Sequence, residues 1–128
     1  MSIKRVLVVD DSPTERHVLT NFLSQNGFEV AVAENGEQAI VRAKEVMPDL
    51  ILMDVVMPGV NGYQATRTLT RDEATHNIPV IMCTSKDQPT DKLWGMRQGA
   101  LDYMIKPINL DELLERIRKL GEAPQAGA

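Results

Sequence analysis

Short apolar runs alternate with amphipathic segments along almost the whole of this 128-residue chain. Each apolar run has the length of a strand, and each segment that follows has the apolar spacing of a helix. Strands that alternate with helices favour a parallel sheet covered on both faces. The sequence therefore predicts one doubly wound α/β domain with five helices and five strands, near residues 5–10, 28–33, 49–53, 79–83 and 101–105.

Capping residues mark the ends of the predicted helices. Ser12-Pro13-Thr14-Glu15 has the sequence of a capping box with proline at the first helical position. We expect Asn35 and Asn109 to be N-caps of the second and last helices, and Gly27 to end the first. Apolar residues at three-and-four spacing predict a core-facing stripe on the last helix, formed by Leu110, Leu113, Leu114, Ile117 and Leu120.

Length and charge restrict the classes of function. A chain of 128 residues with 43% hydrophobic content is long enough for one core, and we expect a domain over residues 1–121 followed by a disordered tail, 122–128. The net charge is −4 and no cluster of Lys and Arg is present, so we expect no direct nucleic-acid binding. The apolar stretch after Arg5 is too short for a signal peptide or a membrane span, which favours a cytoplasmic protein without membrane contact.

Charged side chains stand where predicted strands end. Asp10 and Asp11 follow the first apolar run, Asp54 follows the third, and Lys106 follows the last. Functional residues of open α/β sheets gather at the carboxyl ends of the strands, so these four side chains are expected to converge. Three neighbouring carboxylates repel one another unless a cation compensates them. A donor set of oxygen atoms without histidine favours Mg²⁺, or Mn²⁺, over zinc.

A carboxylate in such a site can attack phosphorus and form an aspartyl phosphate. The charge on the transferring phosphoryl oxygens needs cations already in place, here the metal ion and the Lys106 ammonium. Asp54 is the best candidate for the nucleophile because it stands singly after a buried strand, whereas Asp10 and Asp11 are better placed as metal ligands. An isolated strand-end aspartate is more often a cap or a solvated turn residue, so this prediction depends on the whole constellation.

Four further residues have two interpretations each. The hydroxyl of Thr84 either caps the loop after the fourth run or donates a hydrogen bond to a phosphoryl oxygen. Tyr103 is either a packing residue or a ring that rotates when the Thr84 loop moves. Trp94 belongs either to the core or to a partner surface. Cys83 lies within an apolar run, which favours a buried, unreactive thiol over a reactive one.

This set of residues resembles the receiver domain of two-component response regulators, the CheY-like fold. The resemblance extends over about residues 4–120, and its motifs are Asp10-Asp11, Asp54, Met57-Pro58-Gly59, Asn61-Gly62, Thr84-Ser85, Gly99-Ala100, Tyr103 and Lys106-Pro107. It implies the flavodoxin-like strand order 2-1-3-4-5. A narrower resemblance, carried by residues 12–15, 63–67 and 86–100, is to the stand-alone receivers of type IV pilus twitching-motility systems.

The resemblance also implies roles for individual residues. Asp54 would accept the phosphoryl group from a histidine kinase of the CheA type. Asp11, Asp54 and the backbone carbonyl of Val56 would bind Mg²⁺ directly, and Asp10 largely through water. Lys106 would pair with the phosphate, while Thr84 and Tyr103 would form the switch. A downstream protein would bind the face made by the fourth helix, the fifth strand and the fifth helix.

Other functions remain open at this point. The chain could act as a phosphate sink or as a phosphorylation-independent binding scaffold. A Mg²⁺-dependent phosphohydrolase would need a substrate cap, for which this chain has no insertion, and we expect no enzymatic activity beyond self-catalysed phosphotransfer and slow autodephosphorylation. A flavin-binding module is disfavoured because Asp10-Asp11 would repel a flavin phosphate at the loop after the first strand.

Overall fold

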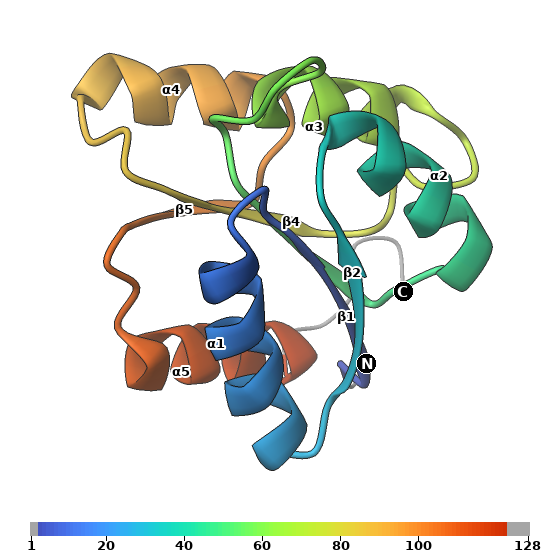
Figure 1. Ribbon diagram of the computed structural model, residues 1–128. Coiled ribbons are helices and arrows are strands. Elements are labelled where there is room, and N and C mark those ends of the chain that lie inside the picture. Colours follow the sequence, from blue (N-terminus) through green and yellow to red (C-terminus); the bar gives the residue numbers. More distant parts are fainter. Residues whose placement is uncertain (1–2, 123–128) are drawn as a thin grey trace.

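Strands and helices alternate strictly along residues 3–122, the part of the chain that the computed structural model describes (Figure 1). The strands are β1 (Arg5–Val9), β2 (Glu29–Ala33), β3 (Leu50–Met53), β4 (Val80–Thr84) and β5 (Asp102–Ile105). The helices are α1 (Pro13–Gln25), α2 (Gly36–Val46), α3 (Gly62–Arg71), α4 (Pro89–Arg97) and α5 (Leu110–Glu122). All strand pairs are parallel and the order is β2-β1-β3-β4-β5, which confirms the predicted fold class and strand order.

The position of each strand follows from its hydrophobic pattern. The apolar residues of β1, β3 and β4 are buried on both faces, and these strands occupy the centre of the sheet. Most residues of β2 are exposed or only partly buried, and β2 lies at the edge of the sheet. The order reverses between β1 and β3, and this reversal opens a crevice at the carboxyl ends of the strands.

Two helical layers cover the sheet. Helices α1 and α5 lie on one face, and α2, α3 and α4 lie on the other (Figure 1). Successive strand residues point to opposite faces, so Val8 packs against α1 and α5 while Val9 packs against α2 and α3. The α5 residues Leu113 and Ile117 are fully buried, whereas the predicted core residue Leu114 is only half-buried.

Most predicted helix ends are confirmed. Asn35 accepts a hydrogen bond from the backbone N–H of Gln38, and Asn109 accepts one from that of Glu112. Only one of the two hydrogen bonds of the predicted α1 capping box forms. The Ser12 hydroxyl accepts from the Glu15 N–H, but the Ser12 N–H donates to Asp10 because the Glu15 carboxylate contacts Lys106.

Three other expectations have a definite outcome. Helix α5 continues to Glu122, one residue beyond the predicted domain end, and the predicted tail residues 123–128 lie outside the described part of the chain. Cys83 is buried, as predicted, and this burial raises the pKa of its thiol to about 12; the low reactivity of the thiol stays a prediction. Trp94 is exposed on α4. Within residues 3–122, every helix is too short or too polar to cross a bilayer.

Candidate functional site

The ends of β1, β3 and β5 bring the predicted site residues to one edge of the sheet. Val9 pairs with Met53, so Asp10 and Asp54 lie beside each other on neighbouring strands. Hydrogen bonds at the end of the sheet hold both backbones, from the Asp54 N–H to the Val9 carbonyl at 2.9 Å and from the Asp10 N–H to the Ala33 carbonyl at 3.2 Å. The Lys106 N–H donates to the Thr84 carbonyl at 2.9 Å, so the long Lys106 side chain has to cross β4 to reach the crevice.

The Lys106 ammonium faces the carboxylates directly. Its Nζ atom lies 2.9 Å from Asp10 Oδ2 and 3.3 Å from Asp54 Oδ2. A single phosphoryl group on Asp54 would therefore lie within reach of the amine. The structure thus brings together three of the four strand-end residues that the sequence singles out.

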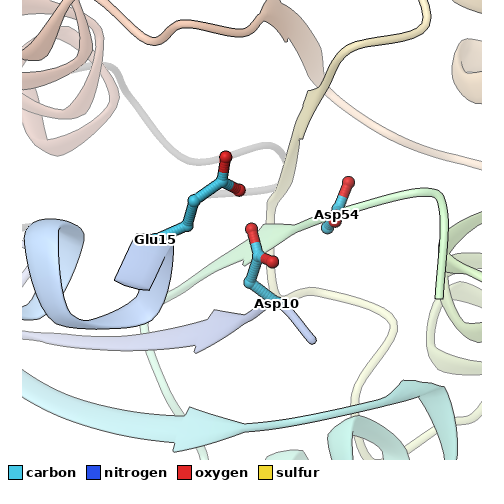
Figure 2. Close-up of side chains that lie close together, drawn as sticks. All are labelled: Asp10, Glu15 and Asp54. Atoms are coloured by element: carbon cyan, nitrogen blue, oxygen red, sulfur yellow. The ribbon is translucent and has the colours of Figure 1, made fainter. Parts of the chain in front are cut away.

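The fourth, Asp11, does not join this group. Its side chain is exposed, and the three carboxylates that gather are those of Asp10, Glu15 and Asp54, with one oxygen of each within 4.8 Å of the others (Figure 2). The metal-ligand role of Asp11 stays a prediction. The metal-ligand role of the Val56 carbonyl also stays a prediction. Val56 lies in the loop after β3, and its side chain is exposed.

Glu15 is the site residue that the sequence reasoning missed. It lies in the first turn of α1, and its carboxylate contacts the Lys106 ammonium. The capping-box pattern assigns this side chain a local partner, and so conceals its contact with a residue far away in the sequence. The available signal was its place at the start of α1, only five residues after Asp10, where a long acidic side chain reaches the same edge of the sheet.

Burial and charge perturb the two central groups. Burial, followed by the charge of Asp10, raises the pKa of Asp54 from 3.8 to about 6, although Lys106 and a hydrogen bond from the Val55 N–H act in the opposite direction. Burial disfavours the charge of Lys106, but its hydrogen bonds to Glu15 and Asp10 and the charge of Asp54 outweigh it and hold the pKa of Lys106 above its ordinary value.

Helix α3 fixes the backbone of the phosphoacceptor candidate. The Gly62 N–H donates to the Val55 carbonyl at 2.9 Å, and a Cβ atom at Gly62 would lie only 2.0 Å from the Asp54 carbonyl oxygen. Asn61 and Gln64 form a reciprocal capping box at the start of α3. Glycine at position 62 therefore allows the helix to begin directly against the Asp54 backbone.

The switch candidates, Thr84 and Tyr103, lie on β4 and β5. Thr84 is fully buried at the end of β4, and its hydroxyl accepts a hydrogen bond from the Lys86 N–H. The Tyr103 ring is also buried, and its hydroxyl donates to the Lys86 carbonyl at 2.8 Å. Tyr63 on α3 donates to the Asp91 carbonyl at 3.1 Å. Two tyrosine hydroxyls thus hold the loop after β4 and the first turn of α4.

The donor set fits a hard divalent cation. The gathered ligand atoms are carboxylate oxygens, which suit Mg²⁺ or Mn²⁺ better than zinc. Three carboxylates around one ammonium leave an excess of negative charge, and the charge of Asp10 adds to burial in raising the pKa of Asp54. A bound cation would relieve this repulsion.

A doubly wound sheet whose first and third strands end in aspartates facing a lysine after the fifth defines a class of phosphoryl-accepting domains. The family model of the response regulator receiver domain matches residues 6–118, so this chain belongs to that family. It is 55% identical over 113 residues to Protein PilH of Pseudomonas aeruginosa strain PAO1, a match that covers 88% of this chain and 93% of PilH. The narrower of the two resemblances seen in the sequence is therefore confirmed.

Other relatives share the receiver but differ in length. The DNA-binding response regulator MtrA of Mycolicibacterium smegmatis is 40% identical over 90% of this chain, which spans about half of MtrA. Among solved structures, the chemotaxis protein CheY4 of Vibrio cholerae superposes with a TM-score of 0.86 and 30% identity, covering 92% of this chain and 98% of CheY4. The receiver domain of the sensor histidine kinase PA1611 from P. aeruginosa, solved with a magnesium ion in its active-site cleft, has a TM-score of 0.87 and 29% identity over 95% of this chain and all of that domain.

Proposed function

We propose that this receiver is switched by phosphorylation of Asp54, with a histidine kinase of the CheA type as the phosphodonor. The observation that carries the proposal is the 3.3 Å separation between Lys106 Nζ and Asp54 Oδ2 in a buried, acidic crevice. With a pKa of about 6, Asp54 is mostly ionised at neutral pH and available as a nucleophile.

The transfer step uses few groups of the chain. An Asp54 oxygen forms a bond to phosphorus while the bond between phosphorus and the kinase imidazole nitrogen breaks, and the electron pair of that bond returns to the imidazole. The Lys106 ammonium pairs with the phosphoryl oxygens, and Thr84 donates a hydrogen bond to one of them. Asp10, Asp11, Asp54 and the Val56 carbonyl would hold Mg²⁺. The ion, when bound, supplies positive charge and fixes the orientation of the phosphoryl group.

The output is a contact with another protein. The face formed by α4, β5 and α5 exposes apolar side chains, including Trp94, Leu101 and Ile105, as expected for a protein-binding surface. The 55% identity with PilH supports a role in type IV pilus twitching motility. The protein acts in the cytoplasm, where its kinase donor would be found, and catalyses only its own phosphorylation and slow dephosphorylation.

Intact-mass analysis tests this proposal. The parent protein is incubated with Mg²⁺ and phosphoramidate beside Asp54→Asn, and we expect one base-labile phosphoryl adduct on the parent and none on the variant. An adduct on both proteins would assign the modification to another residue. Multiple turnover of small phosphate esters would instead favour a phosphohydrolase.

One observation favours a second function, that of a binding scaffold independent of phosphorylation. The Tyr103 ring is buried, and its hydroxyl donates to the Lys86 carbonyl. If Tyr103 keeps this arrangement whether or not Asp54 is phosphorylated, the surface binds its partner without phosphorylation. Equal partner affinity of the parent, phosphorylated parent and Asp54→Asn would support this scaffold, whereas a change on phosphorylation supports the switch.

A further inference from the structure

The Glu15 side chain makes a contact that its position in α1 does not predict. At the third position of a helix, a glutamate following an N-cap serine commonly returns a hydrogen bond to the cap. Here the Ser12 hydroxyl binds the Glu15 N–H, but the Glu15 carboxylate extends to Lys106. Figure 2 shows this carboxylate directed toward Asp10 and Asp54. The cap thus fixes the Glu15 backbone while its carboxylate lies over the phosphoacceptor crevice.

The three partners of Lys106 differ in how firmly they are held. Asp10 and Asp54 follow central strands, and their side chains are 3% and 7% exposed. The Glu15 side chain is longer and 43% exposed. Of the three carboxylates, Glu15 is therefore the one that can leave Lys106 for solvent without breaking the sheet.

A phosphoryl group on Asp54 would compete for the same ammonium. Lysine has three N–H donors, and three carboxylates already surround Lys106. The phosphoryl oxygens add further acceptors and roughly two negative charges. They attract the ammonium and repel the Glu15 carboxylate, so the incoming group and Glu15 exclude each other at Lys106.

We propose that Glu15 is a positioning residue for Lys106, which holds the ammonium beside Asp54 at rest, is displaced by the phosphoryl group, and thereby weakens phosphoryl binding at Asp54. This inference rests on the proposed phosphorylation of Asp54. Because Glu15 stabilises the resting arrangement, its removal shifts the balance toward the phosphoryl-bound state.

Beryllofluoride, a non-covalent phosphoryl analogue, measures this balance at equilibrium. Its affinity is determined by calorimetry at saturating Mg²⁺ for the parent, Glu15→Gln and Asp54→Asn. We expect Glu15→Gln to bind about two- to five-fold more tightly than the parent, the range of a partly exposed ion pair. Glu34→Gln removes the same charge from the partner of Arg16, away from Lys106, and is expected to bind as the parent does.

A double-mutant cycle separates positioning from general charge repulsion. In a Lys106→Met background, Glu15→Gln should no longer change the affinity, because the residue through which it acts is gone. An equal gain in both backgrounds, or no gain in either, would overturn the inference. Absence of beryllofluoride binding by the parent would overturn both the inference and the proposed function, whereas parent binding that Glu15→Gln leaves unchanged would overturn the inference only.

Discussion

The ionisation of Asp54 affects the stability of the native state. The native state retains the Asp54 proton up to a pKa of about 6, whereas the ordinary value, expected in the unfolded chain, is 3.8. The proton therefore stabilises the native state fully below pH 3.8, and this contribution is lost as the pH rises through 6. At neutral pH the metal-free protein carries a charge that weakens its own fold.

Replacing Asp54 with asparagine removes this ionisation. We expect metal-free Asp54→Asn to exceed the parent in free energy of unfolding by up to about 3 kcal/mol at pH 8, and by about half as much at pH 5. Urea unfolding in chelator at several pH values measures the difference, and comparison at each pH cancels the other titrating groups. The exposed Glu73→Gln serves as the control, with a change within about 0.5 kcal/mol. A stability difference in favour of Asp54→Asn that grows as the pH falls would contradict this explanation.

Sequence reasoning succeeded at residues whose position depends on the backbone. Asp10, Asp54 and Lys106 could be predicted because each follows a strand, and parallel strands end at one edge. It failed at Glu15, whose partner depends on the reach of a flexible side chain. The bond between Tyr63 and the Asp91 carbonyl was equally hidden, since nothing in a single sequence pairs a tyrosine with a distant backbone group.

At the scale of elements, the start of α3 determines where the Asp54 backbone lies. Gly62→Ala places a methyl group 2.0 Å from the Asp54 carbonyl oxygen, and a backbone atom cannot yield as a flexible side chain does. We expect a loss of at least about 2 kcal/mol in free energy of unfolding, with a displaced Asp54. Urea unfolding measures the loss. Thr68→Ala, on the exposed face of α3, should change the stability by less than about 0.5 kcal/mol, and an equally stable Gly62→Ala would refute the close approach.

Helix α4 illustrates what the spacing of apolar residues does not reveal. Only Gly95 is buried among its residues, and a Cβ atom there would lie 3.1 Å from the Tyr103 ring and 2.8 Å from Met82 Sδ. The helix therefore contacts the sheet through a glycine, and its larger apolar residues face outward. Such a helix shows no core-facing stripe in the sequence, although the alternation of strands and helices predicts its existence.

At the scale of the molecule, the sheet order couples cation binding at the site to the stability of the fold. A cation that binds the neighbouring Asp10 and Asp54 carboxylates of the native state, which the unfolded chain does not hold together, stabilises the fold by mass action. We expect Mg²⁺ at about 100 times its dissociation constant to add about 2.7 kcal/mol to the parent, seen as a higher melting temperature. The melting temperature of Asp54→Asn should rise clearly less on addition of Mg²⁺. A melting temperature that Mg²⁺ leaves unchanged in the parent would argue against the site.

The solitary tryptophan of the chain gives the molecule its own optical reporter. Trp94 is half exposed on α4, so docking of a protein there would move its indole from water into an apolar contact. Emission spectra can therefore follow association in real time, without a dye or a label attached to the surface being studied.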